Sequence, residues 1–72
     1  MNKHVEIFKT NVRFESEAKE IVLLLKDHFP DSRVNFDLDD CDKILRIEGG
    51  LFIVEKVVAL VTKNGYDCTI LE

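Results

Sequence analysis

The chain has 72 residues, of which 46% are apolar and 33% charged, and its net charge is −4. This length and composition predict one globular domain, residues 1–72, with a small hydrophobic core. The sequence has no basic patch and no stretch near the roughly 20 apolar residues of a membrane span. Neither nucleic acid nor a membrane is therefore expected as a partner.

Two further features predict where the protein resides. Residues Met1–His4 lead directly into a strand pattern and contain no apolar signal-peptide core, which predicts a cytoplasmic protein. The two cysteines, Cys41 and Cys68, are too few for a disulfide framework. In a reducing cytoplasm both are expected to be free thiols.

The first predicted strand is Val5–Phe8, where apolar and polar residues alternate. We expect Val5 and Ile7 to face the core and Phe8 to lie on the opposite face. The mainly polar segment Lys9–Glu15 then predicts a loop.

A helix is predicted next, with Ser16 as its N-cap and its end near His28, because Pro30 excludes helical geometry just before it. Leu23 falls on the side away from the apolar stripe and is expected to be exposed. The stripe itself follows the i, i+3, i+4, i+7 spacing of a buried helix face, at Ala18, Ile21, Val22, Leu25 and Phe29.

A hairpin, Val34–Glu48, forms the centre of the chain, with an Asp-rich turn between two alternating runs. After Gly49-Gly50, a second helix is predicted from about Phe52 to Lys63, with a stripe of valines and a stop at Asn64-Gly65. The segment Tyr66–Leu71 predicts the last strand.

The predicted order is therefore strand, helix, strand, strand, helix, strand. We expect an α+β, ferredoxin-like βαββαβ fold: a four-stranded antiparallel sheet of order 4-1-3-2 with both helices on one face. The first loop, the hairpin turn and the start of the last strand then share one end of the sheet. Cys41 and Cys68 lie at that end, while His4 and His28 lie at the other, so no Cys–His nucleophile pair is expected.

This pattern resembles the heavy-metal-associated (HMA) domains of copper chaperones and metal-transporting ATPases. The resemblance spans almost the whole chain and includes the ending Val57–Tyr66, with its Gly65-Tyr66 pair. That family binds soft metals through a Met-x-Cys-x-x-Cys loop. Here the corresponding loop, Lys9–Glu17, has no cysteine, methionine or histidine, and the best alignment places Phe14 and Glu17 where the family has cysteines. No metal or other cofactor is therefore expected.

Other candidate sites have simpler interpretations. Cys68 has the strand parity of a buried residue, and strand one is expected to keep it too far from Cys41 for a shared ion. The acidic residues Asp37–Asp42 lack the turn glycine and the bidentate Glu of a calcium loop, so a solvated turn is expected.

The sequence thus favours a non-catalytic, HMA-like module that binds an unknown protein partner and is a monomer or a weak homodimer. One candidate surface is the loop end, with Phe14, Glu17 and Tyr66. A second is the open face of the sheet, where parity places Phe8 beside Ile44. The alternative is a degenerate heavy-metal-binding or metal-transport-associated protein that uses Cys68 or Cys41 with an outside ligand. An enzyme is not expected.

Overall fold

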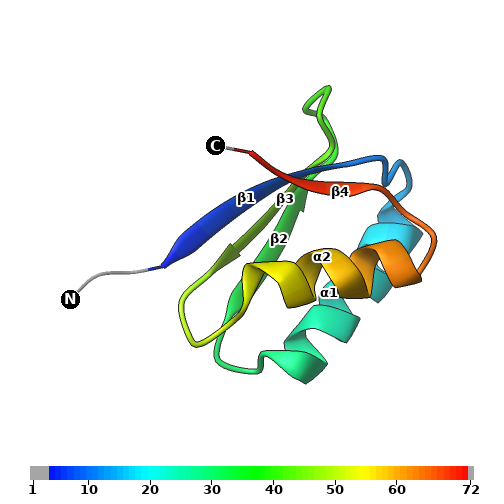
Figure 1. Cartoon of the computed structure of the whole chain (residues 1–72). Helices are drawn as coiled ribbons and strands as arrows, with labels where there is room; N and C mark the ends of the chain where they lie inside the picture. Colours follow the sequence, from blue (N-terminus) through cyan, green and yellow to red (C-terminus); the bar gives the residue numbers. More distant parts are fainter. Residues whose placement is uncertain (1–3, 72) are drawn as a thin grey trace.

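A computed structural model describes residues 4–71 as a four-stranded sheet with two helices, an α+β architecture compatible with a ferredoxin-like fold (Figure 1). The predicted element order is confirmed. The elements are β1 (Val5–Thr10), α1 (Glu15–His28), β2 (Arg33–Asp37), β3 (Ile44–Glu48), α2 (Val54–Lys63) and β4 (Cys68–Leu71).

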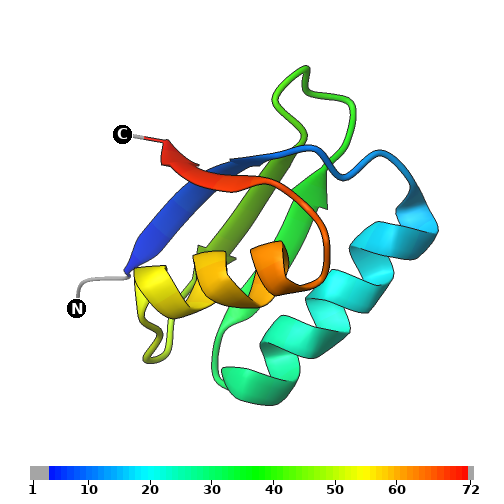
Figure 2. The ribbon, with the colours of Figure 1, turned by 45° about the vertical axis from the view of Figure 1, so that its right-hand side comes forward.

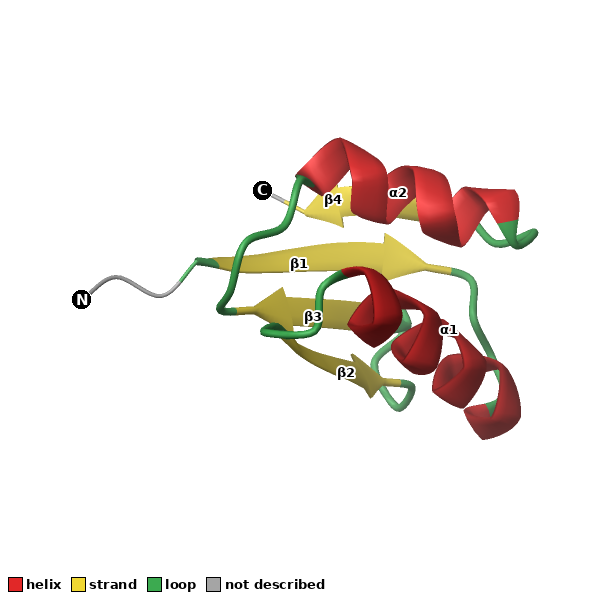
Figure 3. Cartoon of the chain, turned by 90° about the horizontal axis from the view of Figure 1, so that it is seen from below, coloured by secondary structure: helices red, strands yellow, loops and turns green. Residues whose placement is uncertain are grey.

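The strands lie in the order β2-β3-β1-β4, and all neighbours are antiparallel. The predicted order 4-1-3-2 lists the same neighbours from the β4 edge. Both helices cover one face of the sheet, α2 near β4 and α1 toward β2 (Figures 2 and 3). The other face has no helix among the described residues.

The core lies between the sheet and the helices. Leu25 of α1 and Val57 of α2 are completely buried, as their place in the predicted stripes requires, and Leu23 is 70% exposed, as predicted. The helical prediction for the valine-rich segment is also confirmed. The largest fully buried side chains are Phe8, Val12, Leu25, Leu45, Ile47, Val57 and Val61.

The predicted orientation of β1 is wrong. Phe8 is completely buried opposite the equally buried Leu45, whereas Val5 is 37% exposed. Phe8 decides which face of β1 is turned to the core, because its aromatic ring buries more apolar area than a valine or isoleucine side chain. Thr10 and Val12 continue the same two-residue period and are also buried, so the signal was present just beyond the predicted strand.

Several predicted boundaries also differ. Strand β1 continues to Thr10, so the first two residues of the predicted loop Lys9–Glu15 belong to the strand. Helix α1 begins at Glu15 with Phe14 at the N-cap position, so Ser16 lies within the first turn instead of capping it. The backbone N–H of Phe14 donates a hydrogen bond to Oε1 of Glu17, the third residue of the helix, over 3.4 Å. This side chain therefore supplies the acceptor that the N-cap N–H needs. Helix α2 begins at Val54, because Ile53 before it has an extended backbone (φ −112°, ψ 123°), and Phe52 is a buried core residue outside the helix. Strand β4 is shorter than predicted and begins at Cys68.

Candidate functional site

Three connections meet at one end of the sheet, as predicted. The Thr10 N–H donates to the Asp42 carbonyl over 3.0 Å, and the Thr10 hydroxyl donates to the Lys43 carbonyl over 2.6 Å. The same hydroxyl accepts the Val12 N–H at 3.2 Å. The end of β1 is therefore fixed to the β2–β3 turn.

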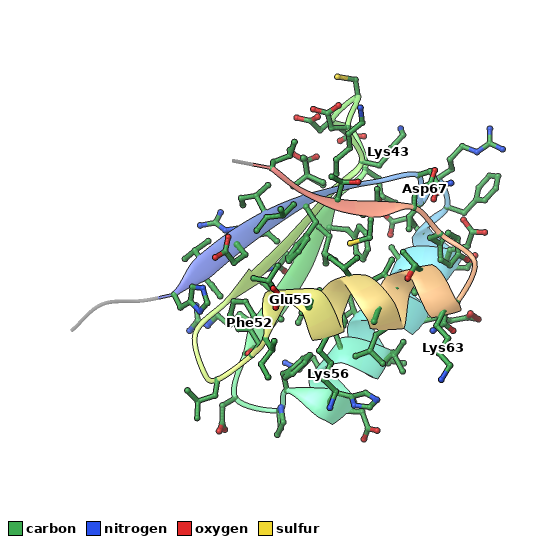
Figure 4. The ribbon with its side chains drawn as sticks, in the orientation of Figure 1. Lys43, Phe52, Glu55, Lys56, Lys63 and Asp67 are labelled. Carbon is green, nitrogen blue, oxygen red and sulfur yellow. The ribbon has the colours of Figure 1, made fainter. Side chains whose placement is uncertain are left out.

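A second pair of hydrogen bonds fixes the β1–α1 loop to the chain that enters β4. The Asp67 N–H donates to Asn11 Oδ1 over 2.8 Å, and Asn11 Nδ2 donates to Asp67 Oδ2 over 3.3 Å. Lys43 and Asp67 lie at this end of the molecule, whereas Phe52 lies at the other (Figure 4). The residue before Asp67 is Tyr66, so this contact also holds Tyr66 beside the loop.

A hollow of about 550 Å³ opens between these segments, and we call it the loop-end hollow. Phe14 is 60% exposed at this hollow, which makes it one of the most exposed large apolar side chains described. Glu17 and Tyr66 are half-buried. The first predicted surface, Phe14 with Glu17 and Tyr66, is therefore brought together. The lining residues are Thr10, Asn11, Arg13, Phe14, Glu17, Cys41, Lys43, Gly65 and Tyr66.

The hollow is lined by charged side chains of both signs and by the hydroxyl of Tyr66. Desolvation raises the pKa of the Tyr66 hydroxyl, and the nearby carboxylates of Glu17 and Glu20 raise it further. The hydroxyl is therefore a neutral hydrogen-bond donor at neutral pH. Lys43 Nζ donates to the Leu38 carbonyl over 2.9 Å, so its ammonium is partly engaged in closing the β2–β3 turn.

The two cysteines have different environments, and both are free thiols. Cys41 is exposed in the β2–β3 turn and lines the hollow. Cys68 is buried, as its parity predicted, and burial raises its pKa to about 11. Cys68 is therefore protonated at neutral pH, which makes it a poor metal ligand.

The β2–β3 turn has the only cluster of three or more His, Cys, Asp or Glu side chains close enough to share a cation within residues 4–71. Ligand atoms of Asp40, Cys41 and Asp42 lie within 4.8 Å of one another. Asp40 Oδ1 already accepts the Asp42 N–H at 2.8 Å, which is the turn-forming role expected for an Asp in this position.

The second predicted surface, Phe8 with Ile44, does not exist. Phe8 pairs with Leu45 and points into the core, so Ile44, the neighbour of Leu45, lies on the opposite face. Ile44 is half-buried and does lie on the open face, as predicted. The prediction failed for Phe8 because the faces of β1 were reversed.

An aromatic contact at the opposite end of the sheet was not predicted. His4 stacks on Phe52 with ring centroids 4.4 Å apart and planes at 7°, and its Nε2 donates to Glu6 Oε2 over 2.9 Å. Phe52 in turn meets Phe29 edge-on at 6.4 Å. No local pattern indicated this contact, because its residues come from three separate segments.

No protein-family model, curated protein or solved structure matches the chain. Neither helix in the described part of the chain has the length and apolar character required to span a bilayer.

Proposed function

We propose that this protein is a cytoplasmic, non-catalytic HMA-like domain of ferredoxin-like topology that binds a protein partner at the loop-end hollow. The observation that carries the proposal is Phe14, an aromatic side chain 60% exposed beside a hollow that also contains Tyr66. Aromatic residues are enriched in the centres of protein interfaces. Arg13 and Glu17 would supply charged contacts around them.

The loop chemistry favours a protein over a soft metal at this end. The loop and first helical turn, residues 9–17, present no thiolate, thioether or imidazole. The hydrogen bonds of Thr10 and Asn11 hold the loop against two other segments, so Phe14 is presented from a fixed backbone. A preorganised surface loses less conformational entropy on binding.

The non-catalytic part of the proposal rests on the separation of reactive groups. His4 precedes β1, while Cys41 lies in the turn that contacts Thr10 at the far end of the same strand. A six-residue strand spans roughly 20 Å, far beyond the hydrogen-bond distance that a nucleophile and its base require.

The test is affinity capture with the purified protein, a Phe14→Ala variant and a Leu51→Ala control. Leu51 is 93% exposed but lies in the β3–α2 connection, so its removal also deletes apolar surface. A genuine partner should be retained by the wild type and Leu51→Ala and lost with Phe14→Ala. Binding of that partner should then shift the NMR signals of Phe14, Glu17 and Tyr66. Equal capture by all three proteins, or shifts elsewhere, would exclude this surface.

A degenerate metal carrier is the second candidate function. Cys41 favours it, because this exposed thiol lies between two carboxylates whose oxygens are within 4.8 Å of its sulfur. Cys68 does not favour it, since it is buried and protonated at neutral pH. A partner would have to supply the remaining soft ligands.

A further inference from the structure

Strand β2 (Arg33–Asp37) forms one edge of the sheet, and within residues 4–71 it pairs only with β3 (Figure 3). Its outer backbone groups are therefore available to another strand. Between β2 and α1 lies a groove of about 400 Å³, which we call the β2 groove. Its apolar lining is Ala18, Val22, Leu23, Val34, Phe36 and Leu38.

The residues of this edge are complementary to themselves. If β2 pairs with a second β2 antiparallel about Asn35, Arg33 of each copy lies opposite Asp37 of the other. Val34 then lies opposite Phe36, also twice. Opposite charges and apolar pairs across neighbouring strands stabilise a sheet, whereas like charges directly opposite destabilise it. A parallel pairing would place Arg33 beside Arg33, so the charge pattern selects the antiparallel arrangement.

The two faces of the strand support the same pairing. Arg33, Asn35 and Asp37 are exposed, so the two ion pairs would form on the open face of the sheet. Val34 is buried and Phe36 half-buried on the helix face, where both line the β2 groove. The two grooves would then adjoin, and Leu23, 70% exposed in the single chain, would be covered.

We propose that a second copy of this chain occupies the β2 edge and forms a two-fold symmetric dimer with a continuous eight-stranded sheet. Identical surface patches that pair about a two-fold axis are the commonest basis of homodimers. The β4 edge has no charge pattern that would select a register or a direction of pairing, because its sequence is Cys-Thr-Ile-Leu. The antiparallel arrangement also leaves both loop-end hollows free, at opposite ends of the dimer.

The interface is small, because each copy contributes one five-residue strand and the rim of one groove. We therefore expect a reversible dimer that forms between roughly 10 µM and 1 mM protein. Sedimentation equilibrium over this range measures its dissociation constant. High salt should weaken the dimer, since the ion pairs are exposed to solvent.

A charge exchange tests the pairing. Asp37→Arg alone places two arginines opposite each other at two positions and should weaken dimerisation by roughly tenfold or more. Arg33→Asp alone should do the same, and the double variant Arg33→Asp, Asp37→Arg should restore the dimer. Thr69→Arg, an exposed change on the other edge, should have no effect. Arg33 also lies opposite Glu48 within the chain, so unfolding of each variant is measured in parallel.

A cysteine at the two-fold axis tests the register independently. In a Cys41→Ser background, Asn35→Cys should form an intermolecular disulfide under mild oxidation, because opposed residues of antiparallel strands have Cα atoms about 4.5–5.5 Å apart. Thr69→Cys should not. A protein that stays monomeric at 1 mM, or a dimer insensitive to both charge variants, would overturn the proposal.

Discussion

Asn11 and Asp67 are joined by two hydrogen bonds, at 2.8 and 3.3 Å, although 56 residues separate them in the chain. This contact fixes the β1–α1 loop, which lines the loop-end hollow, to the segment that enters β4. It is the only side-chain link between these two segments among the described hydrogen bonds.

We expect Asn11→Ala to lower the free energy of unfolding by about 1 kcal/mol, because it removes two hydrogen bonds at an exposed site. Asn11→Asp should cost more, since its carboxylate would face that of Asp67. Urea denaturation measures both. If the two variants have the same stability as the wild type, the contact does not hold the loop.

The orientation of β1 predicts different costs for two adjacent residues. Phe8→Ala should lower the free energy of unfolding by about 3–5 kcal/mol, because Phe8 is completely buried and its removal leaves a cavity. Ile7→Ala should cost distinctly less, since Ile7 is only half-buried on the open face. Chemical denaturation ranks the two. The reverse order would mean that the strand faces are exchanged.

The pair Gly49-Gly50 provides a test of backbone geometry. Both residues have positive φ, +74° and +68°, which an L-residue adopts only with strain. A Cβ at Gly50 would also lie 2.9 Å from the backbone carbon of Asp31, whereas at Gly49 the nearest atom is 3.9 Å away. Gly49→Ala should therefore cost about 1 kcal/mol and Gly50→Ala clearly more. Thermal unfolding of both variants measures the difference.

Burial of Cys68 predicts a loss of stability at high pH. Its pKa is about 11 in the folded protein and 9.0 ordinarily, so the unfolded chain releases the thiol proton first as pH rises. The stabilisation is complete below about pH 9 and is lost between about pH 9 and 11. Denaturation midpoints across this range should fall less steeply in Cys68→Ala. If the midpoints of the two proteins fall equally steeply with pH, the Cys68 thiol is not buried. Tyr66 is present in both proteins, so its contribution to the pH dependence cancels in the comparison.

The Cu(I) affinity separates the two candidate functions. We expect no tightly bound equivalent of Cu(I) in a competition titration against a chelator under reducing conditions, because Cys41 is the one exposed thiol in the described chain. Cys41→Ser is the matched control. One equivalent held tightly by the wild type, and released by this variant, would favour the metal carrier.

The sequence alone determined the element order and most of the core. Helical spacing identified Leu25 and Val57 as buried and Leu23 as exposed, because a helix buries one continuous stripe and this periodicity is local. The Pro30 and Asn64-Gly65 signals placed both helix ends correctly within a residue or two. The loop end was also predictable, since strand directions fix which connections share an end of the sheet.

Tertiary structure decided the rest. Within Val5–Phe8 the local alternation favours burial of Val5 and Ile7, whereas packing against Leu45 and the helices selects the opposite phase and buries Phe8. The Asn11–Asp67 contact and the His4–Phe52 stack each join segments distant in the chain, and the β2 groove forms only once α1 has packed beside β2. Sequence periodicity reports which face of an element is apolar, but the partner of that face exists only once the sheet and helices have packed.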